Sequence, residues 1–447
     1  MEEVIRIGNC SGFYGDRLAA AKELIDGGPI DVLTGDYLAE LTMTILYNQM
    51  QTRGENMGYV GTFLKQIKDV AKDCQEKNIK IVSNAGGLNP KSMAAEVESI
   101  LFDLGLDLKV AYIDGDDIKE DIEEFQKDGE QFINIDRGIP LSESSNTIVT
   151  ANTYFGAWGI KEALDQGADI VICPRVTDAA VVIGPAAWKF NWQRNDYDAL
   201  AGALAAGHII ECGAQCCGGN YSFFEEVPSF RNVGYPIAEI EADGSFTVSK
   251  HPGTGGLISV GTITAQLLYE IKAPAYYNPD VIAHFDTMKI EQTGEDRVRV
   301  TGTRGSSPPP THKVCVNLSG GFRNGMELIL TGLDIEEKAE IFTEALFDGL
   351  KQCNNQCPFC FIDQQPSGKR KSLYLKDDDY RLSFLYGSYL TLTNLSEQDW
   401  LRIDQQRLTP LFVSVHATEP SLRSKLLRNP KAIDLLNQLN WFSDKKI

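Results

Sequence analysis

Three cysteines near the C-terminus have the spacing of a metal or cluster site. The segment Cys353-Asn354-Asn355-Gln356-Cys357-Pro358-Phe359-Cys360 places them in a C-x3-C-x2-C pattern. Three thiolates on one short loop can hold three irons of a [4Fe–4S] cluster and leave the fourth iron open. Zinc is the alternative, but it would need a fourth ligand nearby, and His416 is the only downstream histidine. We therefore predict Cys353, Cys357 and Cys360 as metal ligands, with a cluster favoured.

Polar and glycine residues follow short apolar runs in the N-terminal part of the chain. The predicted strands cover 4–7, 30–33, 80–83, 108–112 and 168–173. Helix-period stretches, at 17–25, 62–77 and 92–104, lie between them, and this alternation predicts a parallel sheet. The loops after its strands would meet at the carboxyl edge, where open α/β sheets bind ligands. The predicted ligand-crevice residues are Asn9, Ser11, Gly12, Tyr14, Asp16, Asp36, Asn84, Gly86, Gly87, Asn89, Arg175, Thr177 and Asp178.

Each of these loops also has a purely structural interpretation. Asp16 and Asp178 suit helix N-caps, and glycine is common in tight turns. The first loop lacks both the G-x-G-x-x-G fingerprint and a phosphate-loop lysine, so neither a dinucleotide nor ATP is predicted. A weaker hypothesis is a hard cation held by carboxylate oxygens. Its candidate ligands are Asp36, Glu40, Asp114, Asp116 and Asp117.

Beyond residue 200 the pattern changes to a mixture of strands and helices. His208, Cys212 and Cys216 are four residues apart and could share a helical face that binds zinc, although the glycines around them favour a loop. A glycine-rich turn precedes a predicted helix at 262–271. Such a turn could bind an anion such as the phosphates of coenzyme A, or it could be only a turn. Its candidate residues are Lys250, Gly253, Thr254, Gly255 and Gly256.

Charge divides the chain at one point. The net charge is −20, which argues against a nucleic-acid partner because phosphate contacts need clustered cations. Residues 350–447 contain 14 Lys+Arg and 10 Asp+Glu, a net of +4, which leaves −24 for residues 1–349. No apolar run is long enough for a membrane span, and the acidic N-terminus does not suggest a secretory signal. We expect a cytoplasmic protein with a small-molecule partner and no membrane contact, and leave homo-oligomerisation open.

Residues 1–348 carry a combination of motifs similar to one family. The motifs lie at 7–17, 31–42, 84–90, 156–160, 175–179, 207–213, 250–256 and 330–334. In combination they resemble the AtuA family of acyclic terpene utilisation proteins. The resemblance implies a role in the catabolism of citronellol- and geraniol-like terpenes through coenzyme A thioesters. It assigns no catalytic residues, because the reaction of the family is undefined.

Residues 350–447 resemble a different family. Besides the cysteines, the motifs at 361–366, 376–384, 390–395 and 413–418 are similar to a radical-SAM-type Fe–S oxidoreductase family. This resemblance implies S-adenosylmethionine bound at the open iron. Asp377–Asp379 could form a solvated turn, but their place in the family motif makes them candidates for the site. His416 follows a predicted strand at 411–415 and could face the crevice or lie in the core. Only 87 residues follow Cys360 in the 447-residue chain, enough for about three βα units. Since a radical must be walled off from water, we expect an inactive fragment.

The predicted fold is therefore α/β, with a parallel-sheet N-terminal domain, an α+β extension and a truncated (βα) partial-barrel fragment. The predicted segments are 1–199, 200–349 and 350–447, with the two families joined near a helix at 344–350. Three functions remain open: an AtuA-like enzyme or enzyme subunit acting on terpenoid or branched acyl-CoA compounds, a radical S-adenosylmethionine oxidoreductase, and a non-catalytic binding scaffold.

Overall fold

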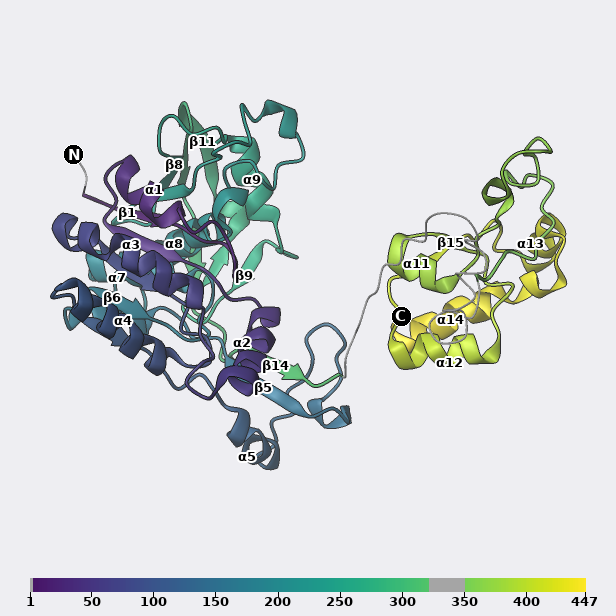
Figure 1. Cartoon of the computed structure of the whole chain (residues 1–447), viewed down its shortest axis with the longest axis horizontal. Helices are drawn as coiled ribbons and strands as arrows, with labels where there is room; N and C mark the ends of the chain where they lie inside the picture. Colours follow the sequence, from purple (N-terminus) through teal and green to yellow (C-terminus); the bar gives the residue numbers. More distant parts are fainter. Residues whose placement is uncertain (1–2, 321–349) are drawn as a thin grey trace. The chain divides into compact units, whose positions relative to one another are not determined.

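The computed structural model describes residues 3–320 and 350–447 (Figure 1). The motif at 330–334 and most of the predicted joining helix lie outside these residues. Two compact units are present, one formed by residues 3–134 and 138–320 and one that contains 350–447. Each unit is described by itself.

A nine-stranded sheet organises the first unit. Its order is β11-β12-β8-β7-β1-β2-β3-β6-β4. The parallel strands are β1 (Val4–Asn9), β2 (Val32–Gly35), β3 (Lys80–Ser83), β6 (Ile170–Ile172) and β4 (Val110–Tyr112). The antiparallel strands are β7 (Pro236–Glu241), β8 (Phe246–Lys250), β12 (Arg297–Thr301) and β11 (Lys289–Gly294). In β1, Ile7 is opposite Val32 on one side and Ala238 on the other, so the α+β extension continues the same sheet.

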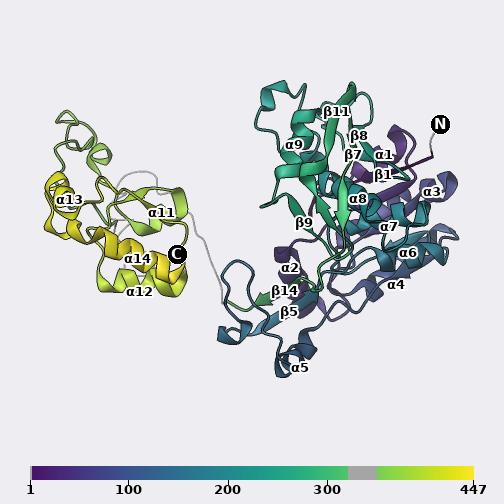
Figure 2. The same cartoon turned by 180° about the vertical axis from the view of Figure 1, so that it is seen from behind.

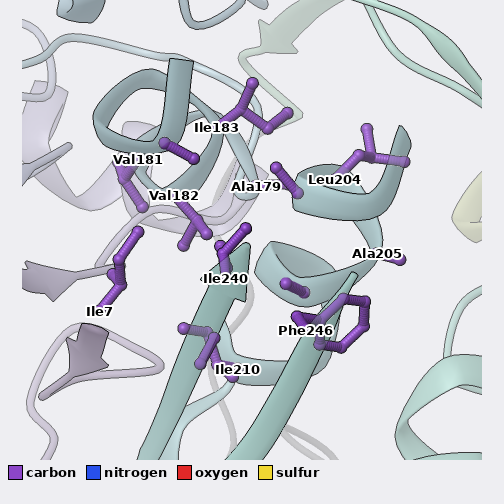
Figure 3. Close-up of a cluster of buried hydrophobic side chains, with 14 of the residues drawn as sticks. Ile7, Ala179, Val181, Val182, Ile183, Leu204, Ala205, Ile210, Ile240 and Phe246 are labelled. Carbon is purple, nitrogen blue, oxygen red and sulfur yellow. The ribbon is translucent and has the colours of Figure 1, made fainter. Parts of the chain in front are cut away.

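Helices cover both faces of this sheet, which Figures 1 and 2 show from opposite sides. One face packs against α1 (Ala20–Gly27), α3 (Gly61–Lys77) and α4 (Pro90–Leu104). The other packs against α6 (Trp158–Asp165), α7 (Ala180–Lys189) and α8 (Tyr197–Ile210). Successive strand residues point to opposite faces, so Ile81 and Val82 enter different cores. Figure 3 shows side chains of α7 and α8 packed beside Ile240 and Phe246 of the antiparallel strands.

Smaller elements complete the first unit. The helices are α2 (Glu40–Arg53), α5 (Ile122–Lys127) and α9 (Val260–Leu268). Strand β5 (Ile148–Thr153) pairs with β14 (Val314–Leu318), and a three-stranded sheet contains β13 (Arg304–Ser306), β10 (Ile282–His284) and β9 (Ala275–Tyr277). Among the helices that the structure describes, none has both the length and the apolar character needed to cross a membrane.

The second unit contains a two-stranded parallel sheet, β15 (Tyr389–Leu390) and β16 (Phe412–Val413). Its helices are α11 (Tyr380–Tyr386), α12 (Glu397–Gln406), α13 (Pro420–Leu427) and α14 (Leu435–Lys445). Its core includes Leu390, Ile403 and Phe442, with Trp400 edge-on to Trp441 at a centroid distance of 4.9 Å. The parallel pair agrees with the predicted βα pattern, and residues 350–447 form no closed barrel.

Candidate functional site

Polar side chains from neighbouring strands meet at the carboxyl edge of the large sheet, as the strand order predicts. Asp36 follows β2 and Asn84 follows β3, and the Asn84 side-chain amide donates to Asp36 Oδ1 at 2.6 Å. The Leu38 amide donates to the same oxygen at 3.2 Å. Asp36 is 5 % exposed and Asn84 is fully buried. The sequence-predicted residues Asp36 and Asn84 therefore form a fixed pair.

Arg175, in the loop after β6, is the cation of this edge. Its side chain is 3 % exposed, and Nη1 lies 3.0 Å from Asp178 Oδ1. The same nitrogen donates to the Leu38 carbonyl at 2.8 Å, and the guanidinium carbon lies 4.3 Å from the ring centroid of Tyr154. The Nε–H group is buried and has no hydrogen-bond partner within residues 3–320 and 350–447. A buried donor without an acceptor is costly in a folded protein, so this atom indicates a ligand position.

Three carboxylates surround this arginine. One oxygen each of Asp36, Asp178 and Glu211 lies within 4.8 Å of the other two, the only such group of potential metal ligands within residues 3–320 and 350–447. The motif containing Glu211 was noted in the sequence, but Glu211 was not predicted as a site residue. It follows α8, a helix buried along almost its whole length, so a carboxylate there needs a special environment.

Two close backbone approaches bring Glu211 to this position. A Cβ at Gly207 would lie 2.8 Å from the Ala179 Cα, which allows α8 to contact the loop of Asp178. A Cβ at Gly12 would lie 2.4 Å from the Cys212 carbonyl carbon. Glycine at these two positions thus lets the end of α8 lie against the first and last loops of the parallel edge.

Burial and mutual repulsion shift the protonation of this group. Burial raises the pKa of Asp36 well above its usual value; Asp178 and Glu211 raise it further, and Arg175 opposes them. Burial also raises the pKa of Glu211, again reinforced by Asp178. Neighbouring carboxyl groups whose pKa values are raised by burial and by one another are an arrangement used for acid–base chemistry.

Glu40 and Tyr154 form a second pair next to Arg175. The Tyr154 hydroxyl donates to Glu40 Oε1. Burial raises the pKa of Glu40, but the Tyr154 hydrogen bond, a backbone amide, Lys313 and Arg175 outweigh it and lower this pKa to about 2. The pKa of Glu40 is therefore lowered where the pKa values of Asp36 and Glu211 are raised, so the edge holds carboxyl groups shifted in opposite directions.

Several predicted crevice residues of the first loop hold the protein together instead. Asn9 is buried and its side-chain amide donates to the backbone carbonyls of Ile210 and Glu211, at 2.8 and 2.7 Å. Asp16 accepts from the Tyr235 hydroxyl at 2.8 Å and from the Gly12 amide at 3.0 Å. These bonds tie the first loop to the end of α8.

Most of the other predicted crevice residues also make structural contacts. Ser11 Oγ donates to the Phe13 carbonyl, and the Tyr14 hydroxyl accepts from Gln49. Asn89 is the N-cap of α4, accepting from the Ser92 amide at 3.1 Å. Gly86 and Gly87 pack against Cys173 and Leu46 too closely for a side chain. Thr177 has a buried, unpartnered hydroxyl close to Arg175 in the chain, so it alone of this group resembles a ligand contact.

The predicted anion-binding turn lacks an available lysine. Lys250 Nζ lies 2.7 Å from Asp296 and donates to the Thr254 carbonyl and hydroxyl, both at 3.1 Å. Gly255 and Gly256 pack against backbone atoms of other segments. A surface pocket of about 320 Å³ beside Gly253 and Thr254 is lined by Glu23 and Asp26, which disfavour an anion. The structure therefore gives Lys250 a structural role, which corrects the sequence interpretation.

The two other metal hypotheses for this unit also change. Helix α8 ends at Ile210, so His208, Cys212 and Cys216 do not share a helical face, as their glycine neighbours indicated. Of the five carboxylates predicted to hold a hard cation, only Asp36 joins the observed group. Asp114 and Asp117 are exposed, and Asp116 accepts from the Asn152 amide at 2.9 Å.

The cysteine loop of the second unit lies next to the ends of β15 and β16. All three thiols are reduced and partly buried. Burial, followed by electrostatic interaction with Cys353 and Cys360, raises the pKa of Cys357. The three sulfurs do not all lie within 4.8 Å of one another. The Asn355 side chain donates to Cys353 Sγ at 3.2 Å. Three free thiols with a hydrogen-bonded sulfur are a donor set that fits an iron–sulfur cluster.

A buried polar network supports this loop. Asp378, fully buried, accepts from the Thr391 amide and hydroxyl at 2.6 Å, and Thr393 joins Thr391 to Asn355. Asp379 is also buried and caps α11, so the aspartate run is not a solvated turn. His416 is exposed, with its ring 5.7 Å from that of Phe359, which places it beside the cysteine loop.

Comparison with family models identifies both parts of the chain. Residues 5–377 match the model described as acyclic terpene utilisation family protein AtuA. The chain belongs to the AtuA family. Residues 334–447 match a radical SAM-like domain, so the two matches overlap at 334–377. No curated protein and no solved structure matches the chain. Both sequence resemblances are confirmed, and the AtuA match extends beyond residue 348.

Within the AtuA match, the parallel edge and the end of α8 supply all the carboxylates of the observed group. The cysteine loop lies inside both matches, but its donor set is the one expected of the radical SAM-like domain.

Proposed function

We propose that this AtuA-family protein is an enzyme, or an enzyme subunit, that performs acid–base chemistry on acyclic terpenoid or branched acyl compounds carried as coenzyme A thioesters. The observation that carries the proposal is the buried Arg175 Nε–H, which has no partner among the described residues and lies among carboxyl groups whose pKa values are shifted in opposite directions. An unpaired buried N–H is suited to donate a hydrogen bond to a substrate carbonyl or carboxylate oxygen.

The roles of the residues follow from their contacts. Arg175 would orient the substrate oxygen, since Leu38, Asp178 and the Tyr154 ring fix its guanidinium. Asp178, the most exposed member of the group at 28 %, would accept a proton. Glu211 or Asp36, whose pKa values are raised by burial, would return one. The family description supplies the terpenoid class of substrate. The coenzyme A thioester is implied by the resemblance of residues 1–348 to that family.

A thermal-shift screen tests the proposal directly. Branched, unsaturated acyl-CoA thioesters should raise the melting temperature of the first unit, whereas free coenzyme A should do so less. Tyr154→Phe keeps the ring under Arg175 but removes the bond to Glu40, and should weaken the shift. Asp198→Asn, at a surface ion pair, is the matched control and should keep it. The absence of a shift with every thioester would reject the proposal.

The thiol loop favours a second function, iron–sulfur cluster binding by Cys353, Cys357 and Cys360. Such a cluster would supply an electron for the cleavage of S-adenosylmethionine when that cofactor is bound. The chain's own residues hold the loop but leave Phe359 and Phe361 exposed at 48 % and 75 %. We propose that the unit binds a cluster without cleaving the cofactor, because the described residues do not exclude water.

Anaerobic reconstitution tests this second proposal. The protein should gain iron, sulfide and absorbance near 400 nm, all of which Cys357→Ala should abolish. Cys315→Ala, which removes a buried thiol of the first unit, is the control and should not change them. Protein that binds no iron would reject cluster binding, and cleavage of S-adenosylmethionine would reject the expected inactivity.

A further inference from the structure

We infer that Asp36, Asp178 and Glu211 bind a divalent cation of the oxygen-preferring class, Mg²⁺ or Mn²⁺. The inference names a ligand for the site of the proposed function and rests on the same side chains. It does not depend on the identity of the acyl substrate.

The geometry of the three carboxylates carries the first step. One oxygen from each lies within 4.8 Å of the others, so a single ion could contact all three with small side-chain movements. The three come from different elements: the end of β2, the loop after β6 and the end of α8. A fixed scaffold therefore brings the oxygens together from positions far apart in the sequence. Mg²⁺ and Mn²⁺ prefer such carboxylate ligands.

The charge of the group carries the second step. Three carboxylates and the guanidinium of Arg175 sum to −2 when all are ionised, which one divalent ion neutralises. Arg175 is paired with only one of them, Asp178, by a contact at 3.0 Å. Asp36 and Glu211 are each 5 % exposed and have no cationic side chain at salt-bridge distance, apart from the imidazole of His208 if it were protonated. Burial disfavours the ionised form of both groups, and a bound cation would stabilise that form.

His208 is an independent indication of a ligand. It is 2 % exposed, and neither ring nitrogen makes a hydrogen bond. Its Nδ1 points toward the group and lies 3.5 Å from Glu211 Oε1. The rings of Tyr276 and Phe285, at centroid distances of 5.3 and 5.8 Å, hold the imidazole in place. A buried imidazole without a partner, beside three carboxylates, is in position to serve as a nitrogen ligand or to orient Glu211.

A Mn²⁺ titration of the full-length, chelator-treated protein tests the inference. Electron paramagnetic resonance of the free ion monitors the titration. One site is expected in the wild type. Asp178→Asn and Glu211→Gln should each weaken the affinity about tenfold or more. Asp117→Asn, an exposed carboxylate in the loop after β4, should leave the affinity within a factor of about two.

Two further measurements separate the alternatives. Cys357→Ala should retain the Mn²⁺ site, because thiolates select softer metals; loss of binding in this variant would assign the ion to the second unit and overturn the inference. Mn²⁺ should raise the melting temperature of the wild type but not of Asp178→Asn. Wild type that binds no Mn²⁺, or equal binding by Asp178→Asn, would overturn it. A rise in melting temperature with an acyl-CoA thioester, but no Mn²⁺ binding, would overturn the inference and leave the proposed function intact.

Discussion

The two units hold reactive side chains in opposite ways. In the first, a sheet covered on both faces by apolar cores brings carboxyl groups and Arg175 to one buried edge. In the second, a sheet of two strands holds the cysteine loop mainly through a buried network of polar side chains. Both units bury some polar atoms that have no partner among the described residues, for example Arg175 Nε and Asn394 Oδ1. The comparison teaches that the first unit positions its reactive groups on a large apolar scaffold, whereas the second positions its thiols through polar contacts.

The largest expected effect comes from removing Arg423, which is central to the second unit. It is 1 % exposed and donates to the carbonyls of Val415, Ala432, Thr391 and Ser414. Arg423→Met removes a buried donor that links these four carbonyls and should destabilise the unit by about 3–5 kcal/mol. Hydrogen exchange resolved by mass spectrometry should show faster exchange across 350–447 only. Lys425→Met, exposed on the same helix, is the control; equal exchange in both variants would contradict the polar-network account.

The next largest effect is a dependence of stability on pH, caused by a buried carboxyl group of the first unit. Burial raises the pKa of Asp280 from 3.8 to about 6, although both oxygens accept from the Ala157 amide. The folded state therefore holds the proton more tightly than the unfolded state. The stabilisation is complete below about pH 4 and is lost as the pH rises to about 6, amounting to about 3 kcal/mol.

Asp280→Asn should remove this dependence. Urea unfolding between pH 4 and 7 should show the wild type losing stability relative to the variant as the pH rises. A difference between the two proteins that stays constant over this range would show that Asp280 is ionised throughout.

Gly12→Ala tests how the carboxylate group is assembled. The new Cβ would lie 2.4 Å from the Cys212 carbonyl carbon, so the first loop and the end of α8 must separate. The overpacking should cost about 1–3 kcal/mol and displace Glu211 from Asp36. Mn²⁺ affinity should fall along with the melting temperature. Gly61→Ala, where a Cβ meets nothing within 4 Å, is the control. Unchanged affinity in Gly12→Ala would separate the loop contact from the site.

The smallest effect distinguishes scaffold from site among the predicted crevice residues. Asn89→Ala removes the cap of α4 and two bonds to the Glu55 and Met57 carbonyls. It should cost about 1–2 kcal/mol in the free energy of unfolding. Acyl-CoA and Mn²⁺ binding should be unchanged, because Asn89 contacts none of the carboxylates. Loss of binding without loss of stability would indicate that Asn89 is part of the binding site.

The parallel edge could be predicted from the sequence because local patterns determine it. The predicted strand at 80–83 coincides with β3, and four further strands differ only at their ends. Asp36, Arg175 and Asp178 were found because each follows such a strand. The predicted helix at 62–77 differs from α3 by one residue, since its apolar positions repeat with helical period.

Long-range pairing could not be predicted in the same way. Glu211 reaches the edge only because α8 packs back against it through Gly207 and Gly12, a contact without local signal. The one available clue was a carboxylate at the end of a largely apolar, alanine-rich helix. Lys250 looked free because its partner, Asp296, is far along the chain. Similarly, the aspartates at 378 and 379 looked solvated until the fold buried them against Thr391 and Arg381.

Hydrogen exchange of the full-length protein with and without a branched acyl-CoA thioester tests the central claim, that the working site is the carboxylate–arginine edge of the first unit. Protection should appear in the loops that follow β2, β3 and β6 and in residues 207–213, with no change across 350–447. Protection confined to the cysteine loop, or none in the loops of the parallel edge at saturating thioester, would contradict the account.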